Sequence, residues 1–201
     1  SRGLGDVYKR QGPYSNTNLG DRVRTIRAAR DRDDFKIADF EPYRPSLGSS
    51  MGFAMSPIFD GTTMVGILVL QFPVELFNRV LTGDYNWSAE GLGTTGECYV
   101  VGPDKTLRSR SRFLRTDPKG FFDSLREAGV SAATIAAIER QGSAMNLVSV
   151  TTPGVDKALR GQSGIEVTTD YRGKRVLSAY GPLELDSLRW AVIASMDEEE
   201  A

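Results

Sequence analysis

Three arginines at alternate positions form the pattern in this sequence that most clearly suggests binding chemistry. Arg108, Arg110 and Arg112 alternate along a predicted strand, so their side chains should point to one face, with serines on the other. Guanidinium groups placed in this way can hold a carboxylate through paired hydrogen bonds. The alternative is a solvated sheet edge, or ion pairs with the acidic residues near the end of the sequence. Arg108 and Arg112 are the two candidates for holding an anion.

Tyrosines and a serine are a second set of candidate binding residues. Ser178 and Tyr180 lie two positions apart on a predicted strand and should therefore share one face. Tyr99 and Tyr171, on other predicted strands, join this face if the register of the sheet agrees. Each tyrosine has an alternative interpretation, as a core aromatic residue whose hydroxyl reaches water.

The composition excludes several classes of function. Histidine is absent from all 201 residues, which removes the commonest general base, metal ligand and activator of a nucleophile. Cys98 is the single cysteine, so no internal disulfide or thiolate metal cluster can form. The carboxylates lie mostly in or beside predicted turns, and no glycine-rich phosphate-binding loop occurs. We therefore predict a domain without catalytic activity, metal or other cofactor.

Charge and hydropathy argue against two kinds of partner within this sequence. The net charge is −1, which gives no long-range field to attract nucleic acid. No stretch approaches the 18 or more apolar residues that a membrane-spanning helix needs. We predict no nucleic-acid binding and no membrane span in the sequence itself.

The first half of the sequence predicts a helix followed by an antiparallel meander. The helix begins with Asn18 as its cap, and its apolar stripe is Leu19, Val23 and Ile26. Three strands follow, with Asp60-Gly61 as the hairpin signal between the last two, at residues 36–43, 52–59 and 62–72. Pro73 then begins a second helix.

The second half predicts a connector and another α+β unit. Residues 83–96 are rich in turn signals, and strands at residues 97–101 and 106–111 flank a turn. Three short helices should begin near Pro118, Ser131 and Pro153. The last three predicted strands are residues 164–171, 174–183 and 189–196.

These elements predict two α+β units, each with an antiparallel sheet flanked by helices. A gapless alignment of residues 57–69 with 182–194 brings similar residues together, which favours an internal duplication. Residues 1–11 read as an artefactual leader, residues 12–82 as the first unit, residues 83–96 as a connector and residues 97–201 as the second unit. A single continuous sheet would contradict this prediction.

Several segments resemble double Cache sensors, whose units are PAS-like. GLGTTGECYVVGPDKTLRSRSRF at residues 91–113, together with residues 161–201, is similar to the membrane-proximal half of these sensors. GPYS, DFEPYRPS and MVGILVLQFP, within residues 12–73, are similar to the later part of the membrane-distal half. The resemblance implies two Cache units, of which the first is truncated at its N-terminal side.

The resemblance also implies a function and a location. Double Cache regions lie outside the inner membrane, in the periplasm, and pass ligand occupancy through a transmembrane helix, which is not in this sequence, to a cytoplasmic output domain. The residues of these motifs are most similar to those of adenylate/guanylate cyclase sensors. The alternatives are the sensor region of a chemotaxis receptor or histidine kinase, and a structural or protein-binding module without a ligand. A homodimer is expected for the intact protein.

The family's ligand chemistry transfers only in part. Amino-acid-binding members use an Arg-x-Trp pair, tyrosines and an aspartate near the end of the last strand of the distal unit. Tyr43 matches a tyrosine position, Met55 is a further candidate, and Gln71 stands where the aspartate is expected. A neutral amide cannot supply the charge that balances an ammonium group. The expected ligand is therefore a small carboxylate or amine rather than an amino acid.

Overall fold

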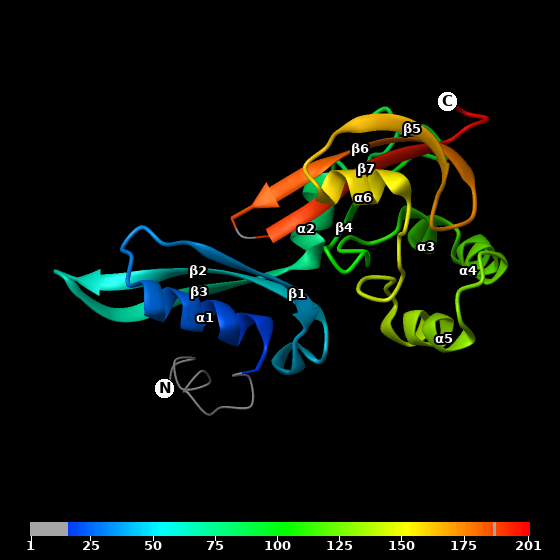
Figure 1. Cartoon of the computed structure of the whole chain (residues 1–201). Coiled ribbons are helices and arrows are strands. Elements are labelled where there is room, and N and C mark those ends of the chain that lie inside the picture. Colours follow the sequence, from blue (N-terminus) through cyan, green and yellow to red (C-terminus); the bar gives the residue numbers. More distant parts are fainter. Residues whose placement is uncertain (1–15, 187) are drawn as a thin grey trace. The chain divides into compact units, whose positions relative to one another are not determined.

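The computed structural model describes residues 16–186 and 188–201, so the predicted leader at residues 1–11 lies outside the described part (Figure 1). These residues form two compact units. Unit 1 comprises the described residues up to Val74 together with residues 185–188, and unit 2 comprises residues 75–184 and 189–201. One antiparallel sheet has the order β1-β2-β3 and the other the order β4-β7-β6-β5. The predicted α+β class with two antiparallel sheets is confirmed.

Helix α1 (Asn18–Ala29) packs one face on the sheet of unit 1. Its cap is Thr17, whose hydroxyl accepts a hydrogen bond from the backbone of Gly20 at 3.3 Å, and not Asn18 as predicted. Leu19 and Ile26 of the predicted stripe are buried against strand residues. The stripe was therefore located correctly, and the cap lies one residue earlier.

The sheet of unit 1 is a meander of β1 (Lys36–Pro42), β2 (Ser50–Asp60) and β3 (Thr63–Pro73). A short 3-10 turn, η2 (Arg44–Ser46), connects β1 to β2. Asp60 pairs with Thr63, so the tight turn occupies residues 61–62, one residue later than predicted. Gly61 has a φ of +56°, which is the left-handed region that favours glycine.

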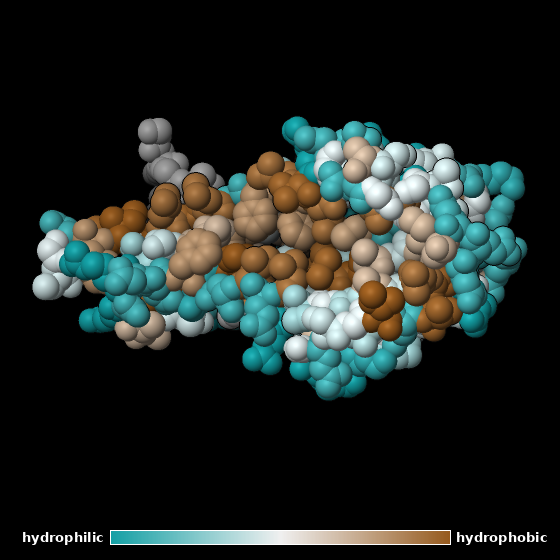
Figure 2. All heavy atoms as spheres, turned by 90° about the horizontal axis from the view of Figure 1, so that it is seen from above, coloured by the Kyte–Doolittle hydropathy of each residue, from teal (hydrophilic) through white to brown (hydrophobic). Residues whose placement is uncertain are grey.

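Apolar side chains are exposed on the other face of this sheet. The side chains of Ile58, Leu68 and Leu70 are 45%, 50% and 59% exposed. They alternate along β2 and β3 with side chains that point to the buried face. Figure 2 shows hydrophobic residues gathered on the face of the molecule that it presents. Unit 1 therefore buries only one side of its sheet within the described residues.

Helix α2 (Val74–Leu81) and the segment after it belong almost entirely to unit 2. The ring of Phe77 packs edge-on against Trp190, with ring centroids 5.7 Å apart. Asn78 accepts a hydrogen bond from the backbone of Arg110 at 2.9 Å. These contacts attach α2 to unit 2, and the division between the two units falls after Val74.

Besides α2, unit 2 contains a four-stranded sheet and four further helices. The strands are β4 (Glu97–Val101), β5 (Gly164–Thr169), β6 (Arg175–Leu185) and β7 (Leu188–Asp197). The helices are α3 (Arg112–Thr116), α4 (Pro118–Glu127), α5 (Ala132–Gln141) and α6 (Pro153–Leu159). Asp117, Ser131 and Thr152 cap α4, α5 and α6, so these three predicted helices are confirmed. Helix α3 was not predicted.

The predicted strand at residues 106–111 is wrong. Only two isolated bridges form there, between Val101 and Leu107 and between Thr106 and Ser149. The backbone N–H of Val100 donates to the hydroxyl of Ser109 at 3.0 Å. A side chain therefore takes the place of the backbone carbonyl that would continue strand pairing with β4. The three arginines therefore do not share one strand face.

The core of unit 2 lies between the sheet and helices α4, α5 and α6. Phe121 and Leu125 of α4, Ile138 of α5 and Val155 of α6 are at most 2% exposed and pack with the buried sheet residues. These side chains fill the space between the sheet and the three helices. No helix among the described residues is long and apolar enough to span a membrane.

Candidate functional site

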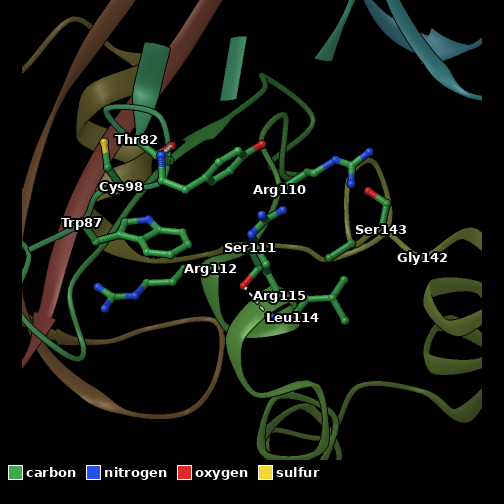
Figure 3. Close-up of a pocket in the computed structure, with 12 residues that line it drawn as sticks. Thr82, Trp87, Cys98, Arg110, Ser111, Arg112, Leu114, Arg115, Gly142 and Ser143 are labelled. Carbon is green, nitrogen blue, oxygen red and sulfur yellow. Dashed lines mark hydrogen bonds between the residues drawn. The ribbon is translucent and has the colours of Figure 1, made fainter. Parts of the chain in front are cut away.

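Unit 2 contains a cavity of about 140 Å³ beside β4 and α3 (Figure 3). Three arginines line it, Arg110, Arg112 and Arg115, together with the aromatic residues Tyr85 and Trp87. Among the described residues, none of those that line the cavity is an aspartate or glutamate. The wall therefore carries positive charge and hydrogen-bond donors.

Apolar groups make up the rest of the wall. Cys98, Leu114 and Ala144 line the cavity beside the indole ring of Trp87. Burial raises the pKa of the Cys98 thiol to about 11, so this side chain is neutral at physiological pH. The cavity thus combines cationic groups with an apolar surface.

Arg112 is held in place at both its backbone and its side chain. Ser111 caps α3, and the backbone of Arg112 donates to the carboxylate of Glu97 at 2.5 Å. The guanidinium lies 4.8 Å from the centre of the Trp87 ring. It also donates to three carbonyl oxygens, those of Leu92, Gly93 and Gly96. Because carbonyl groups are neutral, they satisfy its hydrogen bonds and leave its charge in place.

The other two arginines differ in their partners. The guanidinium of Arg110 forms an ion pair with Glu75 at 3.1 Å, and Glu75 also accepts a hydrogen bond from the hydroxyl of Tyr85. The guanidinium of Arg115 lies over the Tyr85 ring, 4.3 Å from its centre. Arg110 is therefore balanced by a carboxylate, whereas Arg115 contacts an aromatic ring.

One polar atom of a side chain that lines the cavity lacks a partner among the described residues. The indole nitrogen of Trp87 is buried and has no hydrogen-bond acceptor among the described residues. A buried N–H group without an acceptor is unfavourable by about 1–3 kcal/mol. An acceptor supplied from outside the protein would remove this penalty.

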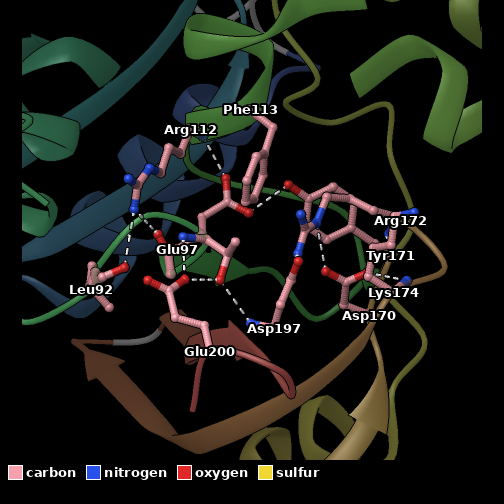
Figure 4. A network of polar contacts seen from close by, with 12 residues as sticks. Leu92, Glu97, Arg112, Phe113, Asp170, Tyr171, Arg172, Lys174, Asp197 and Glu200 are labelled. Carbon is pink, nitrogen blue, oxygen red and sulfur yellow. Dashed lines mark hydrogen bonds and ion pairs between the residues drawn. The ribbon is translucent and has the colours of Figure 1, made fainter. Parts of the chain in front are cut away.

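A buried polar network supports the site from behind (Figure 4). The carboxylate of Glu97 is 2% exposed and accepts a hydrogen bond from the hydroxyl of Tyr171 at 2.6 Å. That hydroxyl is also 2.9 Å from the hydroxyl of Ser111. Burial raises the pKa of Glu97, and the hydrogen bonds from Tyr171 and Arg112 act in the opposite direction. The network ties β4 to the start of α3.

The loop at residues 92–96 links Arg112 to the segment that follows β7. Its carbonyl oxygens face Arg112, while the backbone N–H groups of Thr94 and Thr95 each donate to Glu200 at 2.7 Å. Both threonine hydroxyls also donate to this carboxylate. These hydrogen bonds lower the pKa of Glu200 to about 2. A movement of Arg112 would therefore act on a loop that also holds Glu200.

The structure separates the two predicted anion-binding arginines. Arg112 lines the cavity, but Arg108 is buried beside the turn at residues 102–105, with its guanidinium 2.9 Å from Asp104 and bonded to Thr106. Gly102 leaves room for this packing, because a Cβ atom there would lie only 2.4 Å from the guanidinium carbon. The prediction that Arg108 and Arg112 share a face is wrong.

The other candidates of unit 2 lie in or beside the core. Tyr99 and Tyr171 are buried, with their rings edge-on at 5.4 Å. Ser178 is buried on β6, and Tyr180 is half-buried and packs against the core, below the ammonium group of Lys157. The alternating burial along β6 follows the predicted shared face of Ser178 and Tyr180. None of these four lines the cavity described above.

Two of the three candidates of unit 1, Tyr43 and Met55, are buried on the covered face of its sheet. Tyr43 packs edge-on against Phe53 at 5.0 Å, and Phe53 pairs in register with Gln71. Met55 lies two residues farther along β2, on the same face, and is 2% exposed. Gln71 is exposed and donates to the hydroxyl of Ser46 at 2.9 Å. A separate hollow of about 370 Å³ lies between α1 and β3 and does not include these residues.

Residues of the cavity that the sequence did not indicate come from segments without periodicity. Tyr85 and Trp87 lie in the connector, and Arg115 lies in the unpredicted helix α3. An arginine and aromatic residues in turn-rich segments were the only available signal, and that signal is not specific. No group of three or more potential metal ligands occurs among the described residues.

No protein-family model and no curated protein matches this sequence. Among solved structures, it is similar to the ligand-binding domain of the Pseudomonas aeruginosa amino acid chemoreceptor PctB in complex with L-Gln, with a TM-score of 0.52 and 13% identity over 99% of this chain. For the complex of PctB with L-Arg, the TM-score is 0.50 and the identity 14%, over 89% of this chain. For PctC with GABA, the TM-score is 0.51 and the identity 12%, over 87% of this chain.

The chain spans only part of these structures, since the match covers 63%, 55% and 59% of their respective lengths. At such low identity the likeness concerns the fold. The chain therefore has the mixed helical and antiparallel-sheet fold of these ligand-binding domains.

Proposed function

We propose that the chain is the extracytoplasmic small-molecule-sensing region of a membrane-bound bacterial signal transducer. The observation that carries this proposal is the fold of the described residues, in matches to chemoreceptor ligand-binding domains that cover 87–99% of the chain. The segments that resemble double Cache sensors support the same function from the sequence. The region itself then has no catalytic role.

The ligand we propose is a small molecule with a carboxylate or amine group. The related solved structures hold L-Gln, L-Arg or GABA, each of which carries both groups. In unit 1, Tyr43, Met55 and Gln71 remain the proposed binding residues, and Gln71 offers an amide in place of a charge. In unit 2, Arg112 is the one predicted residue that lines a cavity.

A route for the signal is available in unit 2. Ligand contact with Arg112 would change its hydrogen bonds to the loop at residues 92–96, and this loop holds Glu200 after β7. Because a ligand shifts an equilibrium only through a difference in affinity between two states, the two states proposed here differ in the position of this loop.

We propose a periplasmic location, an inner-membrane anchor outside this sequence, and a homodimer in the intact protein. For the output domain, the sequence resemblance favours an adenylate/guanylate cyclase, and the fold neighbours favour a chemotaxis signalling domain. The sequence adjoining this region in the intact gene distinguishes the two. Absence of any transmembrane helix or signalling domain there would refute the transducer proposal.

A thermal-shift screen tests ligand sensing directly on the protein. Amino acids, GABA, small carboxylates and small amines are added separately, because a ligand that binds only the folded state raises the melting temperature in proportion to the logarithm of its concentration. We expect at least one compound to do so. A complete absence of shifts, while the protein unfolds cooperatively, would contradict the sensing function.

A further inference from the structure

We infer that the cavity of unit 2 is a binding site for a small monocarboxylate with an apolar body. The inference rests on the proposed sensing function for its biological role, and it names the ligand class and the residues that hold it. The carboxylate would be bound by Arg115 and the indole N–H of Trp87, with Arg112 supplying further positive charge.

Charge is the first argument for an anion. Three guanidinium groups line the cavity, and the residues described as lining it include no carboxylate. Glu75, outside the lining, balances Arg110. Arg112 donates to neutral carbonyls, and burial lowers its pKa, whereas the charges of Glu97 and Glu200, which do not line the cavity, act in the opposite direction. An anion in the cavity would offset this desolvation.

The second argument is an unsatisfied hydrogen-bond donor on a side chain that lines the cavity. Trp87 carries the guanidinium of Arg112 over its ring, and its indole N–H is buried without an acceptor among the residues that the structure describes. A carboxylate offers four lone-pair sites and can accept from this N–H and from an arginine together. The indole N–H can only donate a hydrogen bond, so it favours a ligand group that accepts one.

Size and polarity limit the rest of the ligand. The volume of about 140 Å³ admits roughly ten water-sized groups. Leu114, Ala144 and the neutral thiol of Cys98 offer apolar contact and no strong hydrogen-bond acceptor. An ammonium group would face arginines without a carboxylate in the lining. A monocarboxylate should therefore bind more tightly than an amine or a zwitterionic amino acid.

The indole resonances of the protein provide a local readout. The sequence has two tryptophans, so a proton–nitrogen NMR spectrum contains two indole cross-peaks, and Trp87→Phe assigns them. The protein is titrated with acetate, butyrate and benzoate, and in parallel with acetamide, butyramide and benzamide. The amides match the acids in shape and lack the charge. Benzylamine serves as the cationic probe.

We expect butyrate or benzoate to shift the Trp87 cross-peak to saturation while leaving that of Trp190 in place. The matching amide should bind at least about tenfold more weakly, because a hydrogen bond to a charged group is stronger than one to a neutral group. Benzylamine should leave the Trp87 cross-peak unchanged. Equal effects of acid, amide and amine would overturn the assignment of an anion site.

Variants test the residues that hold the carboxylate. Arg115→Gln removes an exposed charge that is stacked on Tyr85, and should weaken benzoate binding by at least about tenfold. Trp87→Phe keeps a ring and removes the N–H, and should weaken binding by about tenfold in calorimetry. Arg126→Gln is the matched control, since Arg126 is paired with Asp123 on α4 and does not line the cavity.

The outcomes separate this inference from the proposed function. If a compound raises the melting temperature but no carboxylate of the panel moves the Trp87 cross-peak, the site is wrong and sensing stands. If Arg115→Gln binds benzoate as tightly as the Arg126→Gln control does, the assignment of Arg115 is refuted. If no compound binds by either method, both proposals fail.

Discussion

Replacing Tyr171 by phenylalanine tests the buried network behind the cavity. The change keeps the ring, which packs against Tyr99, and removes the hydroxyl that donates to Glu97 at 2.6 Å. Glu97 then retains the hydrogen bond from the backbone of Arg112 at 2.5 Å. The hydroxyl of Ser111 loses one neighbour and still accepts from the backbone at the start of α3.

The loss of folding stability in Tyr171→Phe depends on the protonation state of Glu97. A hydrogen bond to a charged group contributes about 1.5–3 kcal/mol, and one between neutral groups about 0.5–1.5 kcal/mol. Tyr171→Phe should therefore lower the free energy of unfolding by about 2 kcal/mol where Glu97 is ionised, and by about 1 kcal/mol where it is protonated.

The sign of the pH dependence follows from burial. Burial raises the pKa of Glu97 in the folded protein above the unfolded value of about 4.3. The stability linked to this group is therefore fully present below about pH 4.3 and is lost as the pH rises through the folded pKa. Removing the hydroxyl of Tyr171 raises this pKa further. The cost of Tyr171→Phe should grow as the pH rises from about 4.3 toward neutrality.

Urea denaturation followed by tryptophan fluorescence is the assay. Both tryptophans, Trp87 and Trp190, belong to unit 2, so the signal reports this unit. With a slope of about 1–3 kcal/mol per molar urea, a loss of 2 kcal/mol lowers the midpoint by about 1 M. Tyr180→Phe is the control, because it removes a hydroxyl from a half-buried tyrosine that has no carboxylate partner in the described part of the chain.

The reasoning would be refuted by either of two results. A cost of Tyr171→Phe that is the same at acidic and neutral pH would mean that the hydroxyl does not stabilise an ionised Glu97. A cost equal to that of Tyr180→Phe would mean that the network contributes no more than an ordinary tyrosine hydroxyl.

Three further predictions concern other parts of the structure. Glu200→Gln should speed amide exchange at Thr94 and Thr95, and unchanged exchange rates in the variant would contradict their hydrogen bonds to Glu200. In the wild type, the protection of these amides should be present above about pH 4.3. It should be lost as the pH falls through about 2, the pKa of Glu200. Because burial raises its pKa to about 11, the Cys98 thiol should react far more slowly with a disulfide reagent in the folded protein than in urea, and equal rates would contradict its burial. Amide exchange should be faster in β3 than in β7, since one face of the unit 1 sheet is exposed, and equally slow exchange in both would oppose this.

Strong periodicity and capping residues made most of the fold predictable. The stripe of α1 and the caps of α4, α5 and α6 are local signals, and the structure uses them. The strand predicted at residues 106–111 failed because a side chain, Ser109, took the place of a backbone acceptor. Such a substitution depends on the packing of β4, which local sequence does not contain.

The candidate site was predictable only through Arg112. Alternation along a strand suggested that Arg108 accompanies it, but Arg108 is bound to Asp104 within its own turn. The residues that do accompany Arg112, including Trp87 and Arg115, come from a connector and from an unpredicted helix. Tertiary packing assembles this cavity, and no spacing in the sequence encodes it.

Signalling by a hybrid receptor tests the central claim most directly. The proposed sensing region, with the transmembrane helices that the proposal expects beside it, is fused to the signalling domain of a chemoreceptor in cells that lack other receptors. Kinase output is followed as compounds from the thermal-shift screen are added. We predict that a compound that stabilises the protein also changes kinase output at concentrations near its dissociation constant. A membrane-inserted hybrid with constant output while that compound is bound would contradict the sensing function.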